Sequence, residues 1–177
     1  PTKNRKPWYT TEFKEKIDNF YWQRFNENLK NGDHSIPVRR RLDETSNNIT
    51  GLLGNPKDNH FKIKGMVMGN VQSGKTQNYL GLINKAMDCG YKIIILLGGH
   101  QNELRKQTQL RVDEGVIGAE SSHLVQGYQH IPIGVGEWRP ERVSTMTTTE
   151  SDFNRQTTEF SGGWRMRIEL AKILLKK

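Results

Sequence analysis

GNVQSGKT, residues 69–76, is a complete GxxxxGK[ST] phosphate-binding loop. Gly69 and Gly74 allow the backbone to turn tightly, so that its N–H groups face phosphate oxygens. Lys75 places a positive charge near the β and γ phosphates, and the Thr76 hydroxyl is a ligand for the accompanying Mg²⁺. The sequence therefore predicts a site for ATP and Mg²⁺, in which Lys75 is the only catalytic residue assigned. The predicted nucleotide-binding residues are Gly69, Asn70, Val71, Gln72, Ser73, Gly74, Lys75, Thr76 and Gln77.

The segments on either side of the loop predict a βαβ unit. Residues 60–68 alternate in polarity and then become apolar, which is typical of a strand entering a core. A helix is expected from about Lys75 until Gly90 ends it, with an apolar face. Residues 91–97 form a nearly unbroken apolar run, as in a parallel strand buried on both faces. We therefore expect an α/β fold. The face of the expected helix comprises Tyr79, Leu82, Ile83, Ala86 and Met87.

Residues 1–56 predict a helical N-terminal extension ahead of a nucleotide-binding domain at residues 57–177. One helix is expected after an N-cap at Thr10 or Thr11, ending at Asn31-Gly32-Asp33. Pro37 favours the start of a second helix, which Gly54-Asn55-Pro56 should end. The apolar positions of the first helix repeat every fourth residue and are Phe13, Ile17, Tyr21, Phe25 and Leu29.

The pattern weakens after the second expected strand. A polar helix is expected from about Asn102 to Glu114. Short strands are expected at Val116-Ile117 and at two later apolar segments, residues 124–128 and 131–135. Residues 145–149 look extended, and residues 164–177 fit either a strand or a helix.

Composition limits the class of protein. The chain has 177 residues and a formal net charge of +8, which suits an anionic partner but also an ordinary solvated surface. Its single cysteine, Cys89, is expected to be a buried small hydrophobe and fits a reducing compartment. No apolar stretch approaches the length of a membrane span, and no signal peptide opens the chain. We therefore expect a cytoplasmic protein with no membrane partner. The five histidines lack metal-ligand spacing, so no metal is expected beyond Mg²⁺ at Thr76.

Residues 65–114 resemble the start of the bacterial Z-one domain family, in the loop GNVQSGKT, in the helix after it and in the segment LRKQTQLR at residues 104–111. That family is described as proposed endonucleases with a superfamily-two helicase-like ATPase core. The resemblance implies a RecA-like P-loop lobe, with a parallel sheet flanked by helices, that hydrolyses ATP and acts on DNA. It also makes four residues candidates for nucleic-acid contact, and the alternative is a polar helix that only supports the loop. The four are Gly99, His100, Arg105 and Arg111.

The chain departs from the family pattern in one respect. Family members continue into an acidic second motif that positions Mg²⁺ and the attacking water, and no acidic pair follows an apolar strand after Lys75. The resemblance therefore implies a lobe truncated before that motif and inactive by itself. The partners expected from the same protein are a C-terminal lobe and a nuclease domain. Two other functions stay open, namely a small P-loop phosphotransferase and a non-catalytic nucleotide-binding interaction module.

Overall fold

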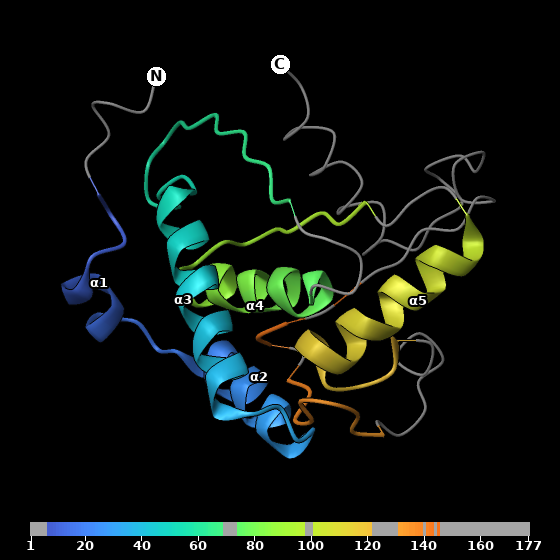
Figure 1. Cartoon of the computed structure of the whole chain (residues 1–177). Helices are drawn as coiled ribbons and strands as arrows, with labels where there is room; N and C mark the ends of the chain where they lie inside the picture. Colours follow the sequence, from blue (N-terminus) through green and yellow to red (C-terminus); the bar gives the residue numbers. More distant parts are fainter. Residues whose placement is uncertain are drawn as a thin grey trace, which may run out of the picture.

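The described part of the chain in the computed structural model is an assembly of helices (Figure 1). The structure describes residues 7–68, 74–97, 101–121, 131–139, 141–143 and 145. The helical elements of this part are α1 (Thr11–Lys16), α2 (Phe20–Asn31), α3 (Ile36–Leu52), α4 (Lys75–Asp88), α5 (Asn102–Val112) and a π-helical turn, η1 (Asp113–Ile117). No helix in these ranges is both long enough and apolar enough to cross a membrane.

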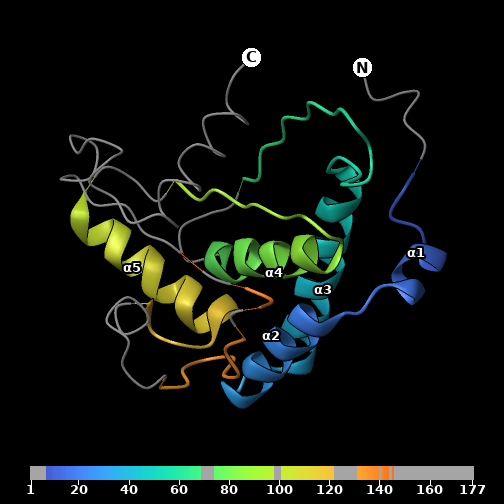
Figure 2. The ribbon, with the colours of Figure 1, turned by 180° about the vertical axis from the view of Figure 1, so that it is seen from behind.

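Helix α4 lies at the centre and packs against α2 and α3 (Figures 1 and 2). The core joins α2, α3, α4 and η1, and the loop-bearing helix therefore shares its core with the N-terminal helices. Its buried side chains are Phe25, Leu29, Leu42, Leu80, Val116 and Ile117.

The ends of α4 follow local sequence signals. The helix begins at Lys75, directly after Gly74, which is left-handed at φ 75° and ψ 22°. It ends in a Schellman motif: Gly90 is left-handed at φ 99°, its N–H donates to Met87 O, and the Tyr91 N–H donates to Ala86 O. The predicted start at about Lys75 and the predicted stop at Gly90 are both confirmed.

The buried face of α4 differs from the expected one. The structure buries Leu80, Gly81, Asn84, Lys85 and Ala86, of which only Ala86 was expected. Gly81 is close to side chains of α2 and α3, which cover this face. The expected positions Tyr79, Ile83 and Met87 are only partly buried against the core. Periodicity located a helix but not the face that its neighbours would cover.

The first expected helix is two helices. Thr10 is the N-cap of α1 and its side chain accepts a hydrogen bond from the Phe13 N–H, as predicted. The helix stops at Lys16 because Ile17 is extended. Helix α2 then starts at Phe20, where the Asp88 carboxylate of α4 accepts from the backbone N–H groups of residues 21 and 22 at 3.0 and 2.9 Å. This tertiary cap takes the place of a local side-chain cap, and the sequence pattern could not show it.

The boundaries of α3 are confirmed. Pro37 lies in its first turn, and the helix ends at Leu52, just before Gly54-Asn55-Pro56. Two hydroxyl side chains are fully buried on its inner face without losing hydrogen bonds: Ser46 donates to Leu42 O and Thr50 donates to Ser46 O, each at 2.7 Å.

The expected parallel sheet is wrong. Residues 61–68 and 91–97 are irregular and make no strand, and the described part of the chain contains no sheet. Met66 is 81% exposed and Leu97 is 90% exposed, whereas a strand inside a parallel sheet would be buried on both faces. The RecA-like lobe with its α/β fold is therefore not the fold seen. An apolar run shows that a segment suits a strand, but a ladder also needs a partner strand.

The later strand predictions are corrected as well. Val116 and Ile117 belong to η1 and are each 2% exposed, so their apolar character reflects the core of a helical turn. Residues 131–135 form no strand and make one isolated bridge, from Pro132 to Ala119. The predicted segments at residues 124–128 and 164–177 lie outside the described residues, and of the segment expected at residues 145–149 only residue 145 is described.

Arg24 of α2 anchors the segment around residues 131–143. Its guanidinium donates to the backbone oxygens of Gly136 at 3.3 Å and Glu137 at 2.8 Å, and also to Val116 O. The Tyr21 hydroxyl donates to Arg142 O at 2.9 Å. Burial lowers the pKa of Arg24, but the side chain remains a cation because its ordinary pKa is so high. The contacts of this one side chain hold η1 and the later segment against α2.

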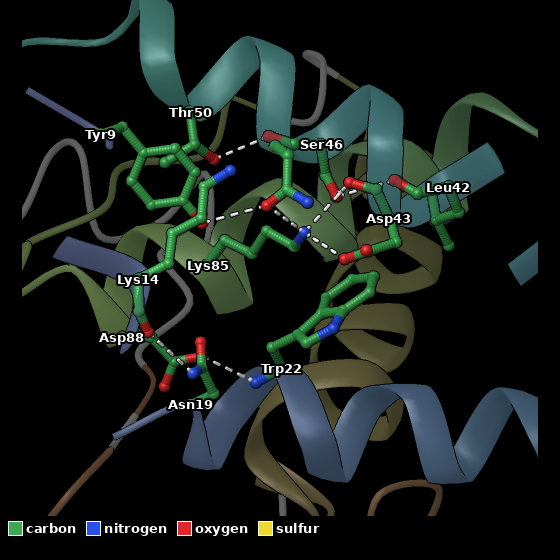
Figure 3. Close-up of polar contacts among 11 residues, drawn as sticks. Tyr9, Lys14, Asn19, Trp22, Leu42, Asp43, Ser46, Thr50, Lys85 and Asp88 are labelled. Atoms are coloured by element: carbon green, nitrogen blue, oxygen red, sulfur yellow. Dashed lines mark hydrogen bonds and ion pairs between the residues drawn. The ribbon is translucent and has the colours of Figure 1, made fainter. Parts of the chain in front are cut away.

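Lys85 joins the N-terminal helices to α4, as Figure 3 shows. Its ammonium donates to the Asp43 carboxylate at 2.5 Å, to Asp43 O at 3.0 Å and to Asn47 Oδ1 at 2.7 Å. The same ammonium lies 4.0 Å from the ring centroid of Trp22. The Tyr9 hydroxyl completes the cluster by donating to Asn47 Oδ1. Burial lowers the pKa of Lys85, and the hydrogen bond to Asp43 opposes that shift.

Candidate functional site

The predicted nucleotide residues that the structure describes lie at the first turn of α4. They are Gly74, Lys75, Thr76 and Gln77, whereas residues 69–73 lie outside the described part. Gly74 holds the left-handed conformation that a residue with a Cβ rarely adopts. The side chain of Asn78 donates to Gly74 O at 3.2 Å and fixes this turn. The helix therefore presents its positive N-terminal end directly after the loop, which favours an anion there.

Arg111 brings the last turn of α5 to the first turn of α4. Its Nη1 lies 3.3 Å from the Thr76 hydroxyl oxygen. Arg105, at the other end of α5, instead donates to the Asn102 side chain at 2.6 Å. Of the predicted nucleic-acid residues, Gly99 and His100 lie outside the described residues. The structure thus brings Arg111 to the nucleotide residues, while Arg105 lies away from them.

A pocket of about 560 Å³ opens beside Thr76, between the C-terminal end of α2, the first turns of α4, and the junction of α5 with η1. Figures 1 and 2, which show the molecule from opposite sides, place these three ends in the same region of the fold. The volume is in the usual range for a small-molecule site. The pocket is lined by Phe25, Asn28, Leu29, Asn31, Gly32, His34, Thr76, Gln77, Leu80, Arg111, Glu114 and Gly115.

The pocket has apolar walls and a polar rim. Phe25, Leu29 and Leu80 are at most 4% exposed and supply the apolar surface. Gly115 closes the wall between α4 and η1, because a Cβ there would lie 2.9 Å from a methyl group of Leu80. Thr76 and the polar side chains of α2, α5 and η1 face the same space. A few convergent polar groups over an apolar surface are typical of a ligand site.

Buried polar contacts fix the position of η1. The Asp113 carboxylate accepts from Gln109 Nε2 at 2.7 Å and from the Ser121 N–H at 2.8 Å. The Asn84 amide of α4 donates to Gly115 O at 2.9 Å. Burial raises the pKa of Asp113, and its hydrogen bonds oppose the shift. Because π-helical turns often occur at functional sites, this junction beside the pocket supports a functional role.

The residues present fit Mg²⁺ together with a nucleotide. Thr76 would supply one hard oxygen ligand, and Mg²⁺ commonly takes only one or two ligands from the protein, with phosphate oxygens and water completing six. Glu114 provides a carboxylate that lines the same pocket. Among the residues with described positions, no group of three His, Cys, Asp or Glu side chains could hold a metal by itself.

Sequence reasoning missed the pocket residues of α2 and η1. Asn28, Asn31 and His34 precede the loop by about forty residues, and Glu114 looked like the end of a polar helix. The available signal was local and weak: Asn28 and Asn31 are three residues apart beside the buried Phe25 and thus share one side of α2.

Comparisons of the chain with known protein families, with curated proteins and with solved structures find no match.

Proposed function

We propose that this chain binds ATP with Mg²⁺ at the first turn of α4. In this proposal, the chain is the ATP-binding part of a helicase-like ATPase that acts on DNA as an endonuclease. The observation that carries the proposal is the placement of the motif: the second glycine of GxxxxGKT, Gly74, is left-handed, and a helix begins at the motif lysine, Lys75. A loop that cradles phosphates needs this combination of a glycine turn and a helix N-terminus.

Three groups would share the phosphate charge. Lys75 is exposed in the first turn, the helix N-terminus adds its partial charge, and Arg111 reaches Thr76 from α5. When bound, Mg²⁺ would supply further charge neutralisation on the phosphate oxygens. Arg111 would contact a phosphate of the nucleotide, because its guanidinium lies beside Thr76 and guanidinium groups pair with phosphate oxygens in a planar, two-pronged geometry.

The DNA part of the proposal rests on charge, on α5 and on the resemblance. The chain carries a formal +8, and Arg105 lies on α5 away from the pocket. We include a reducing cytoplasmic compartment in the proposal, because a chain with a single cysteine, Cys89, does not depend on a disulfide within itself.

Replacing Lys75 tests nucleotide binding. Lys75→Ala should weaken binding of a fluorescent ATP analogue with Mg²⁺ by at least about tenfold, since an uncompensated phosphate charge costs more than about 1.4 kcal/mol. Lys92→Ala, which removes an exposed lysine outside the site, is the matched control and should bind as the parent does. Equal affinities for the parent and Lys75→Ala would remove the nucleotide assignment.

Replacing Arg105 tests the DNA contact. Arg105→Ala should weaken binding of every DNA sequence equally at low salt, lower the salt dependence by about 0.7 to 0.9 in log K per log salt, and spare ATP affinity. Arg40→Ala on α3, which removes an exposed arginine outside α5, is the control. DNA affinity that is unchanged in Arg105→Ala would leave α5 with a supporting role only. Phosphate transfer to a nucleoside would instead favour a phosphotransferase, and ATP affinity without turnover in the intact protein would favour an interaction module.

A further inference from the structure

The pocket beside Thr76 contains polar side chains that the fold itself does not use. Within the described part of the chain, the side chains of Asn28, Asn31, His34, Gln77 and Glu114 line the pocket and have no hydrogen bond to another residue. Asn28 and His34 are half-buried. Hydrogen-bonding groups that converge on an apolar surface without protein partners are available to a ligand.

The two ends of the pocket differ in charge. At the α4 end, the Arg111 guanidinium lies 3.3 Å from the Thr76 hydroxyl, next to the positive helix N-terminus. At the α2 end, the lining residues are Asn28, Asn31 and His34, together with Phe25 and Leu29. A ligand that matches both ends carries its negative charge at one end and a flat, neutral, hydrogen-bonding group at the other. A nucleotide has this construction.

We infer that the α2 end of this pocket holds the base of the bound nucleotide, and that Asn28 and Asn31 select adenine. This inference rests on the proposed function, because it places the phosphates of the same ATP at the first turn of α4. Phe25 and Leu29 are among the residues that line this end of the pocket and give it apolar character. A carboxamide offers one donor and one acceptor, which match N7 and the N6 amino group of adenine.

The polar groups at the α2 end match adenine better than guanine. Guanine presents acceptors at O6 and N7, which arginine or lysine recognises best. No arginine or lysine lines the α2 end, because Arg111, the cation among the lining residues, is held at Thr76. The protein should therefore bind ATP more tightly than GTP. Its affinity for GTP should be close to its affinity for tripolyphosphate, which has no base.

The test compares ATP, GTP and inorganic tripolyphosphate, each with Mg²⁺, on the full chain. The parent should bind ATP about tenfold more tightly than tripolyphosphate, the discrimination that one good amide–base contact provides. Asn28→Leu should lose most of this ratio while its tripolyphosphate affinity stays unchanged, and Asn31→Ala should lose part of it. Asn48→Leu, on α3 away from the pocket, is the matched control and should keep the ratio. Circular dichroism confirms that each variant is folded.

The outcomes separate the two proposals. If ATP and tripolyphosphate bind equally to the parent, or if Asn28→Leu and Asn31→Ala both keep the parent ratio, the base does not occupy this pocket, although the phosphate site stands. If neither ATP nor tripolyphosphate binds, or if Lys75→Ala has no effect on either, the proposed function fails and the inference fails with it. Because Asn31 is exposed at the end of α2, Asn31→Ala provides a result even if Asn28→Leu does not fold.

Discussion

Lys85→Met should destabilise the protein by about 3 kcal/mol. Lys85 has only 4% of its side chain exposed and donates to Asp43 and Asn47, over the ring of Trp22. Hydrogen bonds from a charged donor contribute roughly 1.5 to 3 kcal/mol each, and a desolvated cation–π contact up to about 2 kcal/mol. Methionine retains most of the volume and releases the cost of burying the ammonium, which offsets part of that loss.

The exposure of the partner carboxylate sets the size of the effect. Removing one member of a fully buried ion pair costs roughly 3 to 5 kcal/mol. The Asp43 side chain is 43% exposed, so water can solvate the carboxylate that remains, and the expected cost lies at the lower end. For a chain of this length, about 3 kcal/mol corresponds to a fall in Tm of roughly 6 to 12 °C.

Urea unfolding followed by far-ultraviolet circular dichroism measures this change. Tryptophan fluorescence is unsuitable because Trp22 touches Lys85 and would report the substitution itself. Lys106→Met, at an exposed position on α5, should stay within about 0.5 kcal/mol of the parent. In a double-mutant cycle with Asp43→Ala, the two losses should overlap by about 1 to 2 kcal/mol. A Lys85→Met protein as stable as Lys106→Met would refute the view that this cluster ties α3 to α4.

Two further predictions follow from single sites. Burial raises the pKa of Asp88 to about 6, above its ordinary 3.8, so the folded state holds this proton more tightly than the unfolded state does. The free energy of unfolding should therefore fall as the pH rises from about 4 through about 6. Asp88→Asn should flatten that decline in urea midpoints measured across this pH range, and an unchanged slope would contradict the prediction. Gly118→Ala should lower the free energy of unfolding by at least about 2 kcal/mol, because φ is 88° and the added Cβ would lie 1.9 Å from Gly136 O. Gly65→Ala is the control and should be nearly neutral, since its Cβ meets no described atom within 4 Å. Similar denaturation midpoints for these two variants would contradict the prediction.

Helix boundaries were the most predictable part of the fold. Thr10, the first turn at Pro37, the start at Lys75 and the stop at Gly90 were all identified correctly. These signals act through dihedral preferences and hydrogen bonds within a few residues, so the local sequence carries them. The boundary between α1 and α2 was missed because it involves the carboxylate of Asp88, which comes from a different helix, and the polar helix expected to about Glu114 passes into η1 at Asp113.

The strand predictions failed for a physical reason. Residues 91–97 have the apolar composition of a buried strand, but a strand exists only when its N–H and C=O groups pair with another extended segment. Composition reports the preference of one segment and does not show whether a partner lies beside it. The helical pattern of α4 was similarly correct in period but not in face, because α2 and α3 cover Gly81 and Lys85.

The sequence by itself determined where α4 begins, where most helices stop, and which residues form the phosphate-binding motif, since each depends on neighbours along the chain. Only the tertiary structure decided that Lys85 would be buried, that Arg111 would reach Thr76, and that Asn28 would face the same pocket as Glu114. These pairs are separated by tens of residues, and their contact depends on how whole helices pack. Packing is a sum of many weak contacts, and no short pattern of residues encodes it.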